Sequence, residues 1–258
     1  MRRDPHRRLF LFRQRAAAVL AAFTALSGCY RPPPATAPLA TLRLGGPAAE
    51  SRTLVIFLPG RGDSPENFDR HGFARAVRER GLPVDLLAVD AHLGYYLNGT
   101  VIERLETDVI APARARGYRR IWLVGISIGG LGSLLYLRAH PGVVSGVVLL
   151  APYLGERDVT DEIAAAGGLG RWQPVDLPSD RFHPRQLWRW LQETYAGLSA
   201  PSATPLYLGY GTRDRFVAGD RLLAAVLPPE RVFTTPGGHR WDPWRRLWDT
   251  FLRTGALK

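Results

Sequence analysis

A serine between glycines is the first residue of this sequence whose setting suggests covalent chemistry. Gly125-Ile126-Ser127-Ile128-Gly129 matches the pattern G-x-S-x-G, follows the apolar run 121–124 and precedes a helical stretch over 128–139. Where a strand turns sharply into a helix, side chains at Gly125 and Gly129 would collide with neighbouring backbone. The helix N-terminus offers free N–H groups to a developing negative charge. We therefore predict that Ser127 is a nucleophile; the alternative is a glycine-rich helix start without chemistry.

A histidine near the C-terminus is the candidate general base. His239 follows Gly237-Gly238 after the last expected strand, and it is the late histidine that the chain order Ser…Asp/Glu…His requires. The earlier histidines have other interpretations: a helix end for His140, a solvent-facing helix for His71, a possible pocket wall for His92, and packing or solvent contact for His183.

The acid that orients this histidine has more than one candidate. Asp214 lies in Gly211-Thr212-Arg213-Asp214, directly after the strand expected over 206–210, and is the preferred one. Asp158 and Asp161, which follow the preceding strand, are the competitors. Asp220 is interpreted as the N-cap of the helix expected over 219–227.

An oxyanion hole requires two backbone donors near the nucleophile. The N–H of Ile128, the residue after Ser127, is the first candidate. The second is the N–H of Arg61, in the loop Leu58-Pro59-Gly60-Arg61-Gly62-Asp63-Ser64, where Gly60 and Gly62 let the backbone approach a ligand. No metal or organic cofactor is expected for such a site.

The elements that must position these residues are alternating strands and helices. Runs that are apolar on both faces predict buried parallel strands, and they occur at 54–58, 84–89, 121–124, 147–150, 206–208 and, more weakly, 232–233. Helical stretches are expected over 65–80, 99–116, 128–139 and 219–227, and a last helix after Asp242 with Pro243 in its first turn. The fold class is therefore α/β, with a doubly wound, mainly parallel sheet. Residues 152–203 are too long for a simple crossover and form a small helical insertion before the last strands. This insertion is either a cap over the site or a crossover helix over about 184–196 with a disordered loop.

Composition excludes several classes of protein. Cys29 is the single cysteine and Lys258 the single lysine, so an intramolecular disulfide, a cysteine-built metal site, a P-loop and a Schiff-base enzyme are excluded. The formal net charge is +11, but residues 1–28 hold six of the arginines. Because the remaining basic residues form no run, we expect no nucleic-acid partner.

The N-terminus has the pattern of an export signal. An arginine-rich start precedes the apolar run 16–26, which is shorter than the about 20 residues needed to span a bilayer. Leu26-Ser27-Gly28-Cys29 resembles the bacterial lipobox, in which the cysteine is lipidated and becomes the mature N-terminus. That resemblance implies a signal peptide over 1–28, lipidation of Cys29 and a membrane lipoprotein of the cell envelope; Tyr30, in place of Asp, favours the outer membrane. The proline-rich residues 29–50 are interpreted as a tether, in which 39–44 could form a short edge strand, ahead of a domain over 51–258.

Taken together, the motifs at 58–64, 125–130, 211–214 and 237–241 resemble the α/β-hydrolase superfamily, over about residues 50–255. The likeness is greatest to the carboxylesterase and thioesterase branch, although Pro59 replaces the histidine common in its first loop. The resemblance implies a serine esterase that cleaves small-molecule carboxylic esters or thioesters through an acyl-enzyme on Ser127. A non-catalytic lipoprotein that binds a ligand on this scaffold, and a serine peptidase or acyltransferase, are the alternatives.

Overall fold

The computed structural model describes residues 32–45, 51–180, 182–197 and 203–258. Its compact unit covers Pro34–Lys258. The expected signal peptide over 1–28 and the expected lipidation site at Cys29 lie outside the described residues.

One sheet organises the described part of the chain, with seven strands in the order β1-β3-β2-β4-β5-β6-β7. All neighbours pair in parallel except β1 and β3, which are antiparallel. Every residue of β2 and β5 is buried, as expected for strands covered on both faces. The sheet thus confirms the predicted doubly wound α/β fold, with strands β1 Thr41–Arg43, β2 Thr53–Leu58, β3 Asp85–Val89, β4 Arg120–Ile126, β5 Gly146–Leu150, β6 Leu206–Gly211 and β7 Val232–Thr235.

Strand β1 confirms the short edge strand expected within 39–44, in the stretch that was otherwise interpreted as a tether. Leu39 and Leu44, on either side of β1, are buried. The Leu39 N–H donates to the Asp108 carboxylate at 2.7 Å, and Tyr95 Oη donates to the Thr36 carbonyl at 2.9 Å. The folded unit therefore begins at Pro34 and not near residue 51. The burial of Leu39 and Leu44 and the pairing of β1 with β3 hold this stretch in the sheet.

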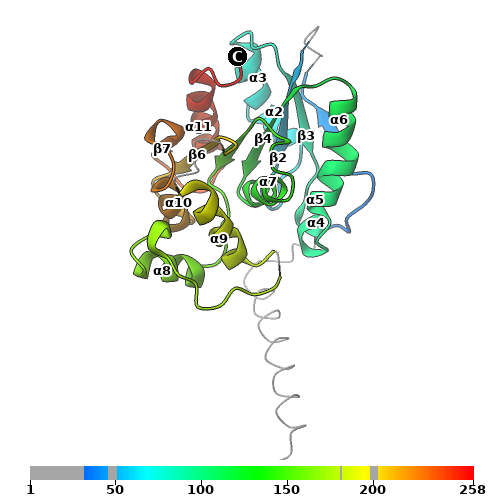
Figure 1. The fold of residues 1–258 in the computed structure, drawn as a ribbon. Helices are drawn as coiled ribbons and strands as arrows, with labels where there is room; N and C mark the ends of the chain where they lie inside the picture. Colours follow the sequence, from blue (N-terminus) through cyan, green and yellow to red (C-terminus); the bar gives the residue numbers. More distant parts are fainter. Residues whose placement is uncertain (1–31, 46–50, 181, 198–202) are drawn as a thin grey trace, which may run out of the picture. The chain divides into compact units, whose positions relative to one another are not determined.

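Helices cover both faces of the sheet (Figure 1). One face carries the buried side chains of α4 Leu93–Leu97, α5 Val101–Arg104, α6 Ala111–Ala115, α7 Ile128–Ala139, α8 Arg157–Ala165, α9 Pro184–Tyr195 and α10 Val217–Ala224. The other face carries those of α2 Glu66–Arg70, α3 Phe73–Arg78 and α11 Trp241–Arg253. A π-helical turn, Leu105–Ile110, joins α5 to α6.

Two helix starts differ from the sequence prediction. Helix α11 begins at Trp241, with Arg240 as its N-cap, two residues before the cap that was expected at Asp242. Helix α10 begins at Val217, so Asp220 lies inside it and is not its N-cap. Neither observed N-cap residue, Phe216 or Arg240, makes a side-chain cap hydrogen bond, so local capping preference does not set these helix starts.

The predicted insertion over 152–203 contains two helices. In α9, Leu187, Trp188 and Leu191 are buried in the same cluster as the sheet, so this helix is a crossover helix packed on the core. Helix α8 and a short 3-10 turn, Leu169–Arg171, precede it. The Ala164–Gly168 segment, expected in a loop, instead ends α8, because Val159 and Ile163 bury one side of that helix.

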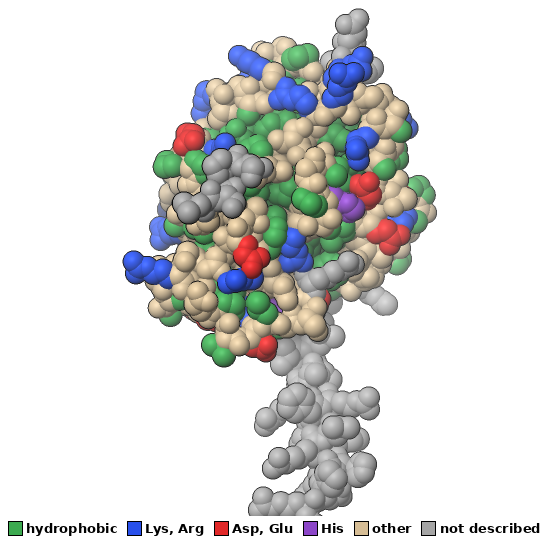
Figure 2. Space-filling view, viewed as in Figure 1, with side chains coloured by type: hydrophobic (Ala, Val, Ile, Leu, Met, Phe, Trp, Pro, Cys, Tyr) green, Lys and Arg blue, Asp and Glu red, His purple; other side chains and the backbone are tan. Residues whose placement is uncertain are grey.

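Arginine side chains are scattered over the face shown in Figure 2, with acidic and hydrophobic ones among them. Within the described residues, no helix combines the length and the apolar character that crossing a membrane requires.

Candidate active site

The turn from β4 into α7 holds Ser127 in a strained conformation. Its φ is 54° and its ψ is −117°, in a region that side-chain-bearing residues rarely occupy. A Cβ on Gly125 would lie 2.3 Å from the Gly129 carbonyl oxygen, and one on Gly129 would lie 2.2 Å from the Leu58 carbonyl oxygen. Both contacts are with backbone, which cannot rotate away. The packing of this turn therefore requires glycine at both positions.

Backbone hydrogen bonds hold the strained residue from two sides. The Ser127 N–H donates to the Leu150 carbonyl of β5 at 3.1 Å. The Ser127 carbonyl accepts from Tyr153 at 2.9 Å and from Gly130 at 3.0 Å. These bonds compensate for a conformational cost of about 1–3 kcal/mol.

Three side chains form one line of hydrogen bonds. His239 Nε2 lies 2.9 Å from Ser127 Oγ, and His239 Nδ1 lies 2.9 Å and 3.0 Å from the two Asp214 carboxylate oxygens. An ionised carboxylate accepts, so Nδ1 carries the proton and Nε2 is free to accept the serine proton. The Asp214 side chain is fully buried and also accepts from the Phe216 N–H at 2.9 Å. The arrangement can remove a proton from Ser127 and stabilise the resulting imidazolium.

Close backbone contacts place the histidine loop beside the aspartate loop. The Arg213 N–H donates to the Gly237 carbonyl at 2.9 Å, and Gly237 has a φ of 132°, which favours glycine. A Cβ on Gly211 would lie 2.4 Å from that same Gly237 carbonyl. The loops after β6 and β7 therefore approach each other as closely as backbone allows, which keeps His239 within reach of Asp214.

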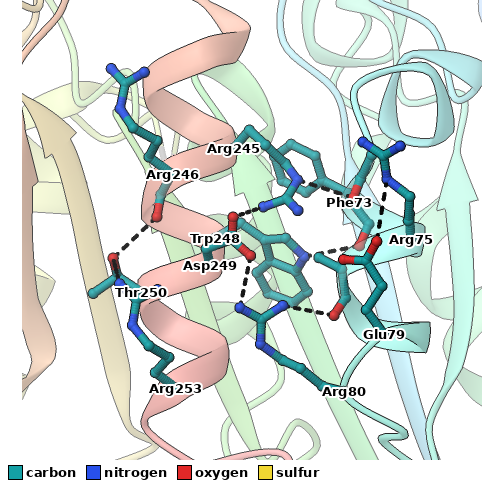
Figure 3. A network of polar contacts seen from close by, with 12 residues as sticks. Phe73, Arg75, Glu79, Arg80, Arg245, Arg246, Trp248, Asp249, Thr250 and Arg253 are labelled. Atoms are coloured by element: carbon teal, nitrogen blue, oxygen red, sulfur yellow. Dashed lines mark hydrogen bonds and ion pairs between the residues drawn. The ribbon is translucent and has the colours of Figure 1, made fainter.

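Helix α11, which starts two residues after His239, is tied to α3 by a polar network (Figure 3). Trp248 Nε1 donates to the Phe73 carbonyl at 3.1 Å, and Arg245 Nε donates to the Gly72 carbonyl at 3.0 Å. Asp249 pairs with Arg245 and, at 3.0 Å, with Arg80. The middle of α11 is thereby bound to α3 and the residues beside it.

The loop after β2 lies against the serine. A Cβ on Gly60 would lie 3.6 Å from Ser127 Cβ and 2.8 Å from Asp63 Oδ2. Trp241 Nε1 donates to Asp63 Oδ1 at 3.1 Å. Arg61 follows Gly60 in this loop. Ile128 is the first residue of α7, so the N–H of Ile128 has no acceptor within the helix. Both expected oxyanion donors therefore belong to segments that adjoin Ser127.

A sequence profile of the Alpha/beta hydrolase family matches residues 55–253. The chain belongs to the alpha/beta hydrolase family. No curated protein sequence matches this hydrolase.

Solved structures share the fold of this hydrolase at low sequence identity. A ferulic acid esterase has a TM-score of 0.55 at 13% identity, covering 84% of this chain and 96% of the other. Est1E from Butyrivibrio proteoclasticus, solved with ferulic acid, has a TM-score of 0.52 at 18% identity, covering 85% and 96%. S-formylglutathione hydrolase from Staphylococcus aureus has a TM-score of 0.52 at 12% identity, covering 88% and 99%. At these identities the likeness concerns the fold alone.

Two carboxyl groups have surroundings that the sequence did not indicate: Asp63, which was given no role, and Asp220, which was interpreted as a helix N-cap. Burial raises the pKa of Asp63, against the opposing effect of its bond from Trp241. Asp220 is completely buried, and within the described residues neither of its oxygens has a hydrogen-bond partner. Its pKa is raised well above the usual value, first by burial and then by the charge of Asp214. No local sequence pattern distinguishes these aspartates from surface ones.

The other histidines and aspartates considered in the sequence lie elsewhere. His92 and His183 cap the N-termini of α4 and α9 through Nδ1, and His140 ends α7. His71 stacks on Trp241 with ring centroids 4.5 Å apart. Asp158 and Asp161 are exposed on α8, and the contact of His239 is with Asp214.

Proposed function

We propose that this protein is a serine hydrolase that cleaves carboxylic esters or thioesters through an acyl-enzyme on Ser127. The observation that carries the proposal is the unbroken line of hydrogen bonds from Asp214 through His239 to Ser127 Oγ. A ligand-binding protein has no physical need for a strained serine aligned with a base. The family of the chain supports hydrolysis as the reaction.

Each residue of the line has a defined role in the proposed reaction. Ser127 Oγ attacks the carbonyl carbon while His239 Nε2 takes its proton, and the same nitrogen returns that proton to the leaving alcohol or thiol. His239 then removes a proton from water, which attacks the acyl-enzyme and releases the acid. Asp214 keeps the proton on Nδ1 and stabilises the imidazolium in both steps.

The backbone N–H groups of Ile128 and Arg61 are proposed to bind the oxyanion. Ile128 stands at the positive end of the twelve-residue helix α7, where a developing negative charge is stabilised. Loss of one such donor costs about 100- to 1,000-fold in rate.

The first experiment is labelling of the full chain with a fluorophosphonate, which reacts with activated serines. We expect a phosphonyl adduct on Ser127, located by peptide mass spectrometry and absent from Ser127→Ala. Asp214→Asn should lower the rate of ester hydrolysis by about 10⁴-fold, because it favours the wrong histidine tautomer. Ser145→Ala, near the amino end of β5, is the matched control and should label normally.

The outcome separates the proposed hydrolase from its alternatives. A folded protein that does not label would favour the non-catalytic binding protein. A labelled enzyme that cleaves a peptide amide faster than esters and thioesters of several chain lengths would be a peptidase. Transfer of the acyl group to an added alcohol in preference to water would indicate an acyltransferase.

We further propose that the enzyme is a lipoprotein of the cell envelope, anchored through Cys29 and located at the outer membrane. The support is the lipobox-like sequence at 26–29. Cys29→Ser should move the protein from the membrane fraction to the soluble fraction. If the variant stays with the membranes, Cys29 is not the anchor.

A further inference from the structure

The loop after β2 forms a tight turn around the proposed oxyanion donor. The Asp63 N–H donates to the Gly60 carbonyl at 3.1 Å, which closes a four-residue turn with Arg61 at its second position. Gly62, at the third position, has a φ of 81°, a value typical of a type II turn. The turn fixes the backbone of Arg61 relative to Asp63, so a contact that holds Asp63 in place also holds Arg61.

The Asp63 carboxylate lies beside the part of this loop that is next to the serine. A Cβ on Gly60 would lie 2.8 Å from Asp63 Oδ2 and 3.6 Å from Ser127 Cβ. The carboxylate and the serine therefore adjoin the same glycine, and a side chain at position 60 would displace the carboxylate. A displacement of Asp63 would in turn move the backbone that lies next to Ser127.

The other oxygen of this carboxylate accepts a hydrogen bond from a distant part of the chain. Trp241 Nε1 donates to Asp63 Oδ1 at 3.1 Å. Trp241 is the first residue of α11 and lies two residues after His239. The bond therefore links the loop that follows β2 to the segment that carries the general base of the proposed reaction.

Aromatic rings pack against Trp241 from several sides. Its ring centroid lies 5.3 Å from that of Phe68, edge to face, and 4.5 Å from that of His71, stacked. Phe68 is completely buried in α2. On the α11 side, Trp241 lies edge to face with Trp244 at 5.4 Å, and Trp244 lies edge to face with His239 at 4.9 Å. These contacts fix the direction of the indole N–H that Asp63 accepts.

We propose that Asp63 is a positioning residue, whose hydrogen bond from Trp241 holds the backbone N–H of Arg61 at the oxyanion. The inference rests on the proposed function, in which Ser127 is the nucleophile and that N–H is one of the two donors. The loop next to Ser127 is bound through Asp63 to Trp241, and one further aromatic ring joins Trp241 to His239. Because an oxyanion donor acts on charge that develops during the reaction, the bond stabilises the transition state and contributes little to substrate binding.

The first experiment removes the acceptor of this bond in the full chain. Asp63→Ala should lower kcat for a water-soluble ester by about tenfold or more and leave KM nearly unchanged, because a displaced donor weakens transition-state binding. The loss should stay below the about 100- to 1,000-fold that a missing donor costs. Each rate is divided by the fraction of protein that a fluorophosphonate labels at completion, so that unfolded protein is not counted as enzyme.

Two further variants separate positioning from a merely structural role. In Asp63→Asn the amide oxygen accepts the same N–H, so kcat should stay close to the wild-type value. Asp69→Ala is the matched control: it removes an exposed carboxylate of α2, paired with Arg78 at 3.9 Å, and should leave kcat unchanged. A merely structural role of Asp63 would reduce the labelled fraction of Asp63→Ala and leave kcat per labelled site unchanged, which would overturn the inference.

The second experiment removes the donor of the bond. Trp241→Phe keeps an aromatic ring but has no N–H, so kcat should fall about as far as in Asp63→Ala. The double variant Asp63→Ala/Trp241→Phe should lose no more than the larger of the two single losses, because both changes break the same bond. Trp172→Phe removes an indole hydrogen bond to Glu162, 2.9 Å long and inside the insertion, and is the matched control that should leave kcat unchanged.

The outcomes distinguish this inference from the proposed function on which it rests. An active wild type beside a fully active Asp63→Ala would overturn the inference and leave the hydrolase standing. Losses that multiply in the double variant would show that Asp63 and Trp241 act separately, and would overturn it as well. A wild-type protein that neither reacts with fluorophosphonate nor hydrolyses an ester would contradict the hydrolase itself, and the inference with it.

Discussion

The two sides of the hydrogen-bonded line Asp214–His239–Ser127 are built differently. On the α11 side, one helix buries Trp244, Leu247, Trp248, Phe251 and Leu252 and is bound to α3 by the network of Figure 3. On the insertion side, α9 packs on the core, but the loop before it exposes Val175 completely. Its hydrogen bonds lie within the insertion itself: Trp188 Nε1 donates to the Leu154 carbonyl at 2.9 Å, Gln192 Nε2 donates to the Trp172 carbonyl at 2.8 Å, and Arg185 pairs with Glu162 at 2.6 Å.

The difference follows from what each side must do. His239 has to stay within hydrogen-bond distance of both Ser127 and Asp214, so the helix after it is fixed by aromatic packing. The insertion side holds no member of the line, and its loop before α9 leaves Val175 and Leu177 exposed.

The largest expected effect is the loss in free energy of unfolding when one of two buried tryptophans, one from each side, is replaced by alanine. Trp248→Ala should lower the free energy of unfolding by about 3–5 kcal/mol, because it opens a cavity among Phe57, Phe73 and Phe251. Trp172→Ala, in the insertion, should cost about 2 kcal/mol, because the loop next to it can close over the space. Denaturant unfolding at constant m-value measures both.

The comparison would fail if Trp172→Ala cost as much as Trp248→Ala and both unfolded the domain in one transition. Amide hydrogen exchange gives a second measurement of the local stability of the two sides. The amides of residues 175–177 should exchange well before those of α11 in the wild type, and Trp172→Ala should leave the exchange of α11 unchanged.

The next effect concerns the buried carboxyl of Asp220. Burial and the charge of Asp214 raise its pKa in the folded state, so above the usual carboxyl pKa the unfolded state binds fewer protons than the folded state and is favoured as pH rises. Asp220→Asn removes that difference, and we expect it to raise the free energy of unfolding at pH 7 by about 1–2 kcal/mol. The gain should shrink as pH falls toward about 4, where the unfolded carboxyl is also protonated.

Asp214→Asn is the control in the same stability measurement, because its carboxylate is hydrogen-bonded; it should be less stable than wild type. A gain for Asp220→Asn that was the same at pH 4 and pH 7 would mean that ionisation of Asp220 is not its source.

The smallest expected effect compares ion pairs. Asp249→Asn, which loses contacts with Arg245 and Arg80 at sites about a quarter exposed, should cost about 0.5–1 kcal/mol. Glu193→Gln on α9, which loses one exposed pair with Arg189 at 2.8 Å, should cost about 0.3 kcal/mol or less. Thermal unfolding at low and high salt checks both, and equal costs would show that the α11 network adds nothing to a single surface pair.

Much of the fold could be predicted because its signals are local. Each buried parallel strand is an apolar run, and the turn at Ser127 needs glycines that the sequence displays. Chain order was sufficient to expect His239 and Asp214 beside Ser127, since all three follow parallel strands at one edge of the sheet.

The rest depends on contacts between distant segments. An edge strand at 39–44 could be expected, but its antiparallel pairing with β3 could not, and the contact of Asp63 is with Trp241, far along the chain. Asp220 looked like a helix cap because capping is a local preference, whereas its burial is a tertiary property. Helix α8 has an apolar side of few residues, which alanines and glycines obscured.

Strand β1 also has a mechanical consequence. Any tension on the chain before residue 32 reaches the domain through Thr36, Leu39 and the three residue pairs between β1 and β3. These are few contacts at one edge, and they would yield first. The loops that carry Ser127, Asp214 and His239 follow β4, β6 and β7, which lie beyond β3 and β2 in the sheet. We therefore expect β1 to detach under tension before the loops that carry Ser127, Asp214 and His239 are distorted.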